Sequence, residues 1–336
     1  MKPELKENEN FEGVFLLKDI SESRTRAGKP YLALVLGNSE SDYVARMWDM
    51  EMKSLPSLDQ GDAVNVKGTT VLYQDQIQLK VDSIARETGS VDSRRLYPSS
   101  SYSEDQLRSE FKRKIDKISD SDLGSLMSVV EKDGDFMNRF FTSPAAVTMH
   151  HASIGGLAEH TLGVCTIAES VADAYPWLRR DIIIAGSLLH DIGKVQEYEV
   201  GSSFEVTIHG QLLGHISIGY AMLEKWISEV PDFPAGLALE VKHIILSHHG
   251  QLEYGSPKVP VIPEAMVVHF ADDLDAKLDM LRTAQATAGK EGREVAGSYV
   301  RGLGRFFFFP GDGGAEEGEP ASGTGADDKD DQGKLF

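Results

Sequence analysis

The distribution of histidine constrains this chain more than any other feature of its sequence. All ten histidines of the 336 residues lie between His150 and His269. Helical spacing places His160 beside Leu157 and Val164, on the apolar face of a helix expected from about residue 154 to residue 174. The imidazole of His160 is therefore predicted to point into the protein interior.

Further helices carry histidines and acids in the same way. The run from Ile182 to Leu189 is apolar all round, which predicts a buried helix that ends at His190-Asp191-Ile192-Gly193. The imidazole of His190 and the carboxylate of Asp191 are therefore expected to lie together in the protein interior. Asp272 lies four residues after Val268 on a helix expected to begin at Pro263, and is predicted to face inward as well.

Two more inward histidines are predicted from apolar stripes. His215 shares a helical stripe with Leu212, Met222 and Trp226. His248, followed by His249, comes after Val241, Ile244 and Ile245 and just before Gly250, which is expected to end the helix.

Buried imidazoles and carboxylates need compensation, because each polar or ionised group loses its hydration when it is buried. A single histidine on an apolar face is more often a hydrogen-bonded core residue than a metal ligand. Several helices that point such groups inward favour one or two bound divalent ions instead. Imidazole with carboxylate and no thiolate suits Mn, Fe, Co, Ni or Zn, and two ions sharing Asp191 would suit phosphoryl transfer.

Composition narrows the class of protein. The single cysteine, Cys165, excludes an intramolecular disulfide and favours a reducing compartment, which we take to be the cytoplasm. No apolar stretch is long enough to span a bilayer, so no membrane association is expected. The net charge of −19 argues against nucleic-acid binding through one broad basic surface, although bound metal ions can attract a polyanion locally.

The first 90 residues predict a small all-β domain. Short alternating runs between Phe11 and Glu87 indicate five strands, with a helical insert from Met50 to Leu58 between the third and the fourth. This pattern suits an oligonucleotide-binding (OB) barrel. Three cations crowd the first turn, Arg24, Arg26 and Lys29, and are candidates for substrate contacts.

The remainder of the chain predicts a second, all-α domain and a tail. Residues 91–102 belong to a Ser-rich stretch without periodicity, which predicts a linker. Ser103-Glu104-Asp105-Gln106 has the form of a capping box that opens a helix. Residues 103–310 are expected to be helical. Residues 311–336 hold eight acids and two lysines and are expected to be a disordered acidic tail.

The ordered set His160, His190-Asp191 and Asp272 resembles the ligand pattern of the HD-domain metal-dependent phosphohydrolases, with HDIGK at residues 190–194 as one of its common forms. The added His215 and His248-His249 resemble members that hold two metals. The OB-type region followed by HHASIGGLAEHT, LLGHISIG, ILSHHG, EYGSPK and ADDLDAK is similar to the bacterial YhaM family over roughly residues 11–310. This resemblance implies a metal-dependent 3′-to-5′ exoribonuclease for single-stranded RNA, with single-stranded DNA as a second candidate substrate.

The resemblance also implies roles for individual residues. One metal would be held by His160, His190, Asp191 and Asp272. The second would be held by His215, His248 and His249, with Asp191 bridging. We expect Mn, Fe or Co in preference to Mg, with Zn or Ni as further options.

Three other residues near these motifs can each be interpreted either as functional or as structural. Lys194 would offer its ammonium to a phosphate oxygen, or would be an ordinary solvated lysine. His151 would contact substrate phosphate or cap the local backbone. Asp275 would orient a ligand from behind, or would be a solvated helix acid.

Two alternative functions stay open, and a homo-oligomer is compatible with the sequence. The first alternative is a nucleotide or cyclic-nucleotide phosphohydrolase, because metal ligands alone do not select a substrate. The second is a non-catalytic nucleic-acid-binding protein in which the helical domain is structural.

Overall fold

The computed structural model describes residues 7–39, 41–54, 58–73, 76–89, 91–147, 151–201, 203–290 and 298–309. The predicted acidic tail at residues 311–336 and His150 therefore lie outside the described residues. The chain forms two compact units, Met1–Arg282 and Thr283–Phe336. The domain boundaries expected from the sequence stay predictions.

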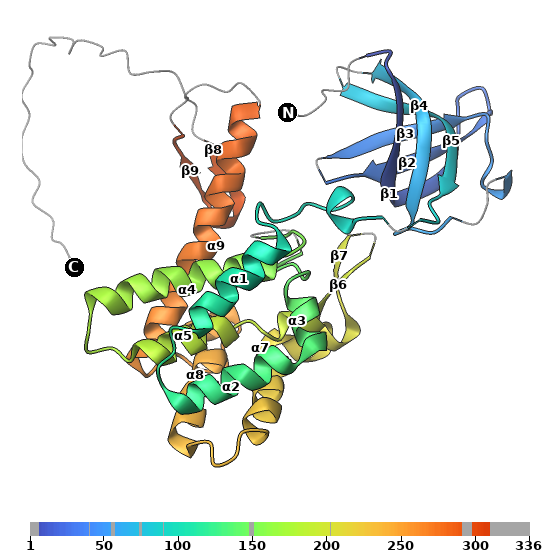
Figure 1. Cartoon of the computed structure of the whole chain (residues 1–336). Helices are drawn as coiled ribbons and strands as arrows, with labels where there is room; N and C mark the ends of the chain where they lie inside the picture. Colours follow the sequence, from blue (N-terminus) through green and yellow to red (C-terminus); the bar gives the residue numbers. More distant parts are fainter. Residues whose placement is uncertain are drawn as a thin grey trace, which may run out of the picture. The chain divides into compact units, whose positions relative to one another are not determined.

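The N-terminal strands close into a barrel, drawn in blue and cyan in Figure 1. Its strands are β1 (Asn10–Arg24), β2 (Pro30–Gly37), β3 (Asp42–Trp48), β4 (Ala63–Tyr73) and β5 (Gln76–Arg86), in the spatial order β1-β2-β3-β5-β4. All neighbours are antiparallel except β3 and β5, which run parallel. The predicted five strands and the OB-type barrel are confirmed.

Alternation along each strand builds the barrel core. Leu32, Leu34 and Leu36 of β2 are buried, while the residues between them are only partly covered. Where a helical insert was predicted, the structure has one turn of 3-10 helix, Met52–Ser54, and residues 55–57 lie outside the described part.

The predicted linker is a packed segment. It contains a short 3-10 helix, Ser93–Arg95, followed by buried Leu96 and Tyr97. The ring of Tyr97 lies 5.7 Å from that of Phe204, and Ser99 forms a single parallel bridge with Ile154. These contacts attach the segment to the helical region.

The helical region begins at the predicted capping box. The Ser103 side chain accepts from the Gln106 amide, and the Gln106 side chain accepts from the Ser103 amide. The helices are α1 (Glu104–Ile115), α2 (Ser121–Lys132), α3 (Gly134–Phe140), α4 (Gly156–Ala174), α5 (Arg180–Leu189), α6 (Lys194–Glu197), α7 (Ile208–Ser228), α8 (Ala235–Ser247) and α9 (Pro263–Lys290). Two short hairpins accompany them, β6–β7 (Tyr198–Val200, Phe204–Val206) and β8–β9 (Ser298–Val300, Arg305–Phe307). The predicted helical nature of this region is confirmed, and the two hairpins are the places where the prediction of helix is wrong.

The buried helix α5 lies at the centre of the helical core. It packs against α4, α8 and α2, and every residue from Ile182 to Leu189 is buried, as predicted. Large side chains from outer helices, Phe111 of α1 and Trp226 of α7, complete the same core. No helix among the described residues is both long and apolar enough to cross a membrane.

The helical stripe predicted around His215 is wrong at its N-terminal end. Gly214 interrupts α7 with a φ of 70°, a left-handed conformation that glycine adopts without steric cost. Leu212 is therefore 78% exposed, whereas the side chain of His215 is 12% exposed. His215 shares the inward face only with the residues that follow the kink, including the buried Trp226.

Candidate metal centre

Four of the predicted ligands converge from three helices. His160 comes from α4, His190 ends α5 with Asp191 directly after it, and Asp272 comes from α9. His160 Nε2 lies 3.1 Å from Asp272 Oδ1 and 3.4 Å from Asp191 Oδ2. His190 Nε2 lies 3.3 Å from Asp191 Oδ2 and 3.9 Å from Asp272 Oδ1. His160, His190 and Asp272 offer atoms close enough together to hold one ion.

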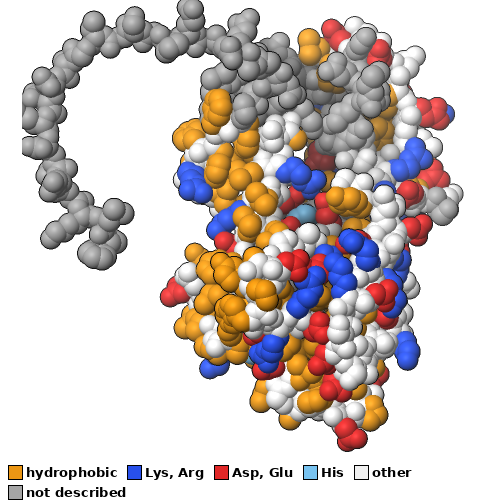
Figure 2. Space-filling model, turned by 60° about the vertical axis from the view of Figure 1, so that its left-hand side comes forward, with side chains coloured by type: hydrophobic (Ala, Val, Ile, Leu, Met, Phe, Trp, Pro, Cys, Tyr) orange, Lys and Arg blue, Asp and Glu red, His pale blue; other side chains and the backbone are white. Residues whose placement is uncertain are grey.

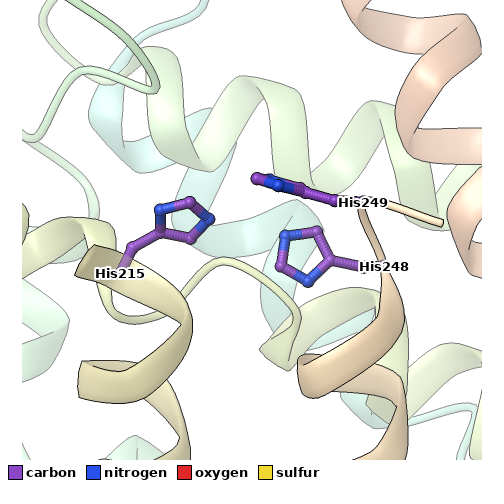
Figure 3. A group of neighbouring side chains, drawn as sticks. All are labelled: His215, His248 and His249. Carbon is purple, nitrogen blue, oxygen red and sulfur yellow. The ribbon is translucent and has the colours of Figure 1, made fainter. Parts of the chain in front are cut away.

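A second group consists of three histidines, drawn in Figure 3. His215 follows the kink in α7, while His248 ends α8 and His249 follows it. Ring centroids are 5.1 Å apart for His215 and His249 and 4.5 Å apart for His248 and His249. In Figure 3 the three rings lie around a common space.

Asp191 lies between the two groups and presents one oxygen to each. Oδ2 lies toward His160 and His190, as described above. Oδ1 lies 3.5 Å from His215 Nε2 and 3.4 Å from His248 Nε2. The side chain of Asp191 is buried, so both oxygens are held within the protein.

Lys194 forms a buried ion pair with the same carboxylate. Its Nζ lies 2.6 Å from Asp191 Oδ2, and the lysine is buried with it. The interpretation of Lys194 as an ordinary solvated lysine is therefore wrong. Its contact with a phosphate oxygen stays a prediction.

Helix ends orient two of the imidazoles. His190 and His248 both occupy the C-cap position of their helices, and each points Nδ1 at the carbonyl three residues earlier, at 2.8 Å. These carbonyls, of Ser187 and Ile245, belong to the last helical turn, where carbonyls lack intrahelical partners. The Nδ1–H donates to that carbonyl, which leaves Nε2 as the lone-pair atom that faces the centre.

Side-chain and loop acceptors orient the other imidazoles. Asp275 Oδ2 lies 2.7 Å from Nδ1 of His160, and Glu197 Oε2 lies 3.0 Å from Nδ1 of His215. The carbonyl of Tyr254 accepts from Nδ1 of His249 at 2.9 Å. Each of the histidines predicted as ligands thus has its Nδ1 held and its Nε2 directed toward the centre, the arrangement usual for metal-bound imidazole.

Asp275 also joins His151 to this network. His151 Nε2 lies 3.0 Å from Asp275 Oδ2, and the His151 amide donates to Asp279 at 2.7 Å. Hydrogen bonds from both sides thus fix the carboxylate behind His160. The interpretation of Asp275 as a solvated acid is wrong, because its side chain is mostly buried. Whether His151 contacts substrate stays a prediction.

Sequence reasoning missed Glu197. It ends α6, close behind the HDIGK motif, and its Oε1 also accepts the backbone amide of His215 at 3.0 Å. The only available signal was an acid six residues after Asp191. Its partner lies eighteen residues further on, across the β6–β7 hairpin, which periodicity does not predict.

The acids and imidazoles of the first group shift one another's pKa. Burial raises the pKa of Asp191, but Lys194 and His190 outweigh burial and hold this pKa well below its usual value. Burial lowers the pKa of His160, yet the carboxylates of Asp191, Asp272 and Asp275 raise it well above the usual value overall. A metal ion that binds His160 must therefore displace a proton.

The histidines of the second group behave differently. Burial lowers the pKa of His248, and the nearby Asp191 only partly offsets this. Burial together with the neighbouring His248 also lowers the pKa of His249. Both imidazoles are therefore neutral near pH 7 and have their lone pairs ready for a ligand.

The residues present fit divalent ions. Among residues that the structure describes, Nε2 of His190, of His215 and of His248 and Oδ1 of Asp191 are buried without a hydrogen-bond partner. Buried polar atoms without partners are costly, and several that converge on one space indicate a cation site. Figure 2 shows one face of the molecule, on which a histidine side chain is visible between acidic and basic side chains.

A large cavity lies behind this centre and does not contain it. The cavity has a volume of about 980 Å³ and lies among α1, α4 and α9, with His151, Asp275 and Arg282 in its wall. None of the residues predicted as metal ligands lines it. The predicted metal ligands therefore lie outside this cavity, whose wall reaches His160 through the hydrogen bond of Asp275.

The cations predicted to contact substrate lie in or beside the turn between β1 and β2. An Arg24 guanidinium nitrogen donates to the carbonyl of Gly28 at 3.1 Å, and Arg26 is exposed. Lys29 is exposed, and its Nζ lies 3.6 Å from Asp49. Their contact with nucleic acid stays a prediction.

Comparisons with known proteins agree with the geometry. The HD domain family model matches residues 157–277. The chain is 34% identical over 278 residues to 3′-5′ exoribonuclease YhaM of Bacillus velezensis, which covers 82% of this chain and 88% of that protein. The protein of the same name from Bacillus subtilis is 32% identical, with the same coverage.

A solved structure is similar to part of the chain. The second OB-fold domain of replication protein A from Methanococcus maripaludis is 15% identical, covers 26% of this chain and 91% of that chain, and has a TM-score of 0.21. The identity and coverage of the full-length relatives are sufficient to assign the family. The chain belongs to the family of the 3′-5′ exoribonucleases named YhaM.

Proposed function

We propose that this chain is a metal-dependent exonuclease that removes nucleotides from the 3′ end of single-stranded RNA. The relatives that carry the name 3′-5′ exoribonuclease span most of both chains. The HD domain and the cluster of imidazoles and carboxylates support hydrolysis of a phosphodiester. The single, buried Cys165 fits the cytoplasm predicted from the sequence.

One observation carries the proposal. The two oxygens of Asp191 face two separate groups of histidine Nε2 atoms, at 3.3–3.5 Å. This arrangement suits a carboxylate shared by two ions, which we expect to be Mn, Fe or Co. His160, His190 and Asp272 would hold the first ion, and His215, His248 and His249 the second.

Two bound divalent ions would supply Lewis acidity toward a phosphodiester and lower the pKa of water. The protein's own contribution is orientation and charge balance. The carbonyl and carboxylate oxygens that accept from each Nδ1 keep the imidazoles in one tautomer and one ring orientation. Lys194 offsets the charge of Asp191 and keeps the carboxylate ionised in a buried place, and we propose that its ammonium also approaches a substrate phosphate.

The outer face of the barrel offers a surface for a single strand. The rings of Tyr31 and Trp48 lie 4.9 Å apart, and the Arg46 guanidinium lies 5.5 Å from the centre of the Tyr31 ring. Trp48 is exposed. Bases stack on such rings irrespective of sequence, and the arginine adds attraction for phosphate. We propose that this face, with Arg24, Arg26 and Lys29, contacts the RNA.

The test is incubation of the purified full chain with a 5′-labelled single-stranded RNA in the presence and absence of Mn. We expect a ladder that shortens from the 3′ end, abolished by EDTA and by Asp191→Ala. Asp273→Ala is the matched control, because Asp273 is an exposed acid of α9 that pairs with Lys277. Intact RNA with every divalent metal tried would refute the proposal.

Parallel reactions decide between substrate classes. Single-stranded DNA of the same sequence tests the second candidate polymer. Hydrolysis of dNTPs or cyclic dinucleotides, with RNA left intact, would favour the nucleotide phosphohydrolase instead. RNA binding without hydrolysis of any phosphate ester would favour a non-catalytic binding protein.

A further inference from the structure

The hairpin β8–β9 has an unusual composition for this chain. Its strands, Ser298–Val300 and Arg305–Phe307, are joined by one turn of 3-10 helix, Arg301–Leu303. Between Ser298 and Phe309 the sequence has five aromatic residues, two arginines and no acid. The chain as a whole carries a net charge of −19. This segment is therefore a local cationic and aromatic surface.

The ladder places aromatic rings together on one face. Tyr299 pairs directly with Phe306 across the antiparallel strands, so the two side chains project to the same side. Their ring centroids lie 5.1 Å apart. Tyr299 is 55% exposed and Phe306 is 70% exposed, while the neighbouring Val300 is buried. The hairpin thus turns its aromatic face to the solvent and its aliphatic residue inward.

Further exposed groups extend this surface. Phe308, two residues beyond Phe306, is 61% exposed. Both arginines are exposed. Arg305 pairs with Val300, so it projects from the opposite side of the hairpin to Tyr299 and Phe306, and its guanidinium lies 4.9 Å from the centre of the Phe307 ring. Exposed aromatic rings interleaved with guanidinium groups form the combination that holds single-stranded nucleic acid, through base stacking and phosphate contacts.

We propose that the β8–β9 hairpin is a binding site for single-stranded RNA, separate from the barrel and from the metal centre. Bases stack on Tyr299 and Phe306 on one side of the narrow hairpin, while Arg301 in the connecting turn and Arg305 on the other side contact phosphates of the strand as it passes around the hairpin. Charge favours this ligand over a second copy of the chain. A symmetric contact between two such hairpins would bring four guanidinium groups together, and the hairpin offers no carboxylate to offset them.

Binding of a fluorescent single-stranded RNA to the full chain in EDTA tests the proposal without requiring catalysis. We expect Tyr299→Ala/Phe306→Ala to weaken binding on the order of 10- to 100-fold, with an unchanged salt dependence. Arg301→Gln/Arg305→Gln should instead lower the slope of log affinity against log salt by about 1.4, for two phosphates lost from a single strand. Tyr175→Ala/Trp177→Ala, which removes equally exposed rings of the helical region, should bind as the wild type does.

Light scattering on the same samples separates RNA binding from self-association. An aromatic variant with the mass of the wild type and weakened RNA binding supports the proposal. A smaller mass for that variant would make the hairpin a contact between copies and would overturn it. Affinity within twofold of the wild type would also overturn it. If the aromatic variant has a lowered melting temperature, the arginine variant tests the proposal instead. A salt slope equal to that of the wild type would then overturn it.

Discussion

Nδ1 of His160 lies 2.7 Å from Oδ2 of Asp275, a carboxylate that also meets His151 at 3.0 Å. Burial raises the pKa of Asp275, but the hydrogen bonds with His151 and His160 lower it to about 2. The carboxylate is therefore ionised at every pH at which the protein is expected to work. It fixes the tautomer of His160 in which Nε2 faces Asp191 and Asp272.

Asp275→Asn should therefore impair the centre without removing a predicted ligand. We expect a loss of 10- to 100-fold in activity or in metal affinity, because the amide no longer fixes the imidazole as an anionic acceptor does. Titration of RNA hydrolysis with Mn measures both quantities. Asp273→Asn is the matched control on the same helix. Equal titration curves for the two variants would show that Asp275 does not position His160.

Gly163 provides a second way to disturb the same carboxylate. A Cβ at this position would lie 2.1 Å from Asp275 Oδ1, so Gly163→Ala must displace Asp275. We expect at least a tenfold loss of activity, by the same effect on His160. A Cβ at Gly124 of α2 would meet only open space, so Gly124→Ala should retain activity and gain about 1 kcal/mol in stability. Urea unfolding and RNA hydrolysis of both variants check this contrast.

Helical periodicity was sufficient to predict the inward direction of His160, His190 and His248. Alternation of apolar and polar residues predicted the five barrel strands, because alternation reports directly on burial. Helical periodicity was wrong about Leu212, because a single left-handed glycine ends the stripe and no periodic signal marks that backbone angle. It missed Glu197, whose partner His215 is reached only through tertiary packing.

The separate groups around Asp191 lead to a prediction on metal content. Native mass spectrometry of the chain purified with Mn should show two ions per chain. His215→Ala/His249→Ala should retain one ion, because His160, His190 and Asp272 remain. His209→Ala is the control, since His209 is exposed on α7 and lies outside these groups. One ion in the wild type, or none in the double variant, would contradict the assignment of two sites.

Cys165 should be chemically inert in the folded protein. It is buried in α4, and burial raises the pKa of its thiol to about 12. The thiolate is the nucleophilic form, so reaction with a disulfide reagent at pH 8 should be slow for the native chain. In urea the same thiol should react fully within minutes. Rapid labelling of the native chain, followed by absorbance, would contradict this burial.

A buried ion pair away from the metal centre predicts the acid sensitivity of the fold. Lys114 of α1 pairs with Glu169 of α4, and the side chains are 2% and 6% exposed. Lys117 and Arg180 also contact this carboxylate, at 2.9 Å and 2.7 Å. Burial raises the pKa of Glu169, but Lys114 and Lys117 lower it by more than burial raises it. The pKa of Glu169 is therefore below its usual 4.5.

Glu169→Gln should destabilise the chain by about 3 kcal/mol at pH 7, because it leaves the buried Lys114 with only the more distant Glu110, at 3.9 Å, as a counter-charge. A lowered folded-state pKa means that this stabilisation is complete above about pH 4.5 and is lost as the pH falls through the folded value. Urea unfolding of both proteins should therefore differ at pH 7 and converge at the acid end. The double substitution Lys114→Met/Glu169→Leu should recover much of the loss, since it removes both buried charges. A constant difference between wild type and Glu169→Gln down to pH 3 would show that the ion pair is not the cause.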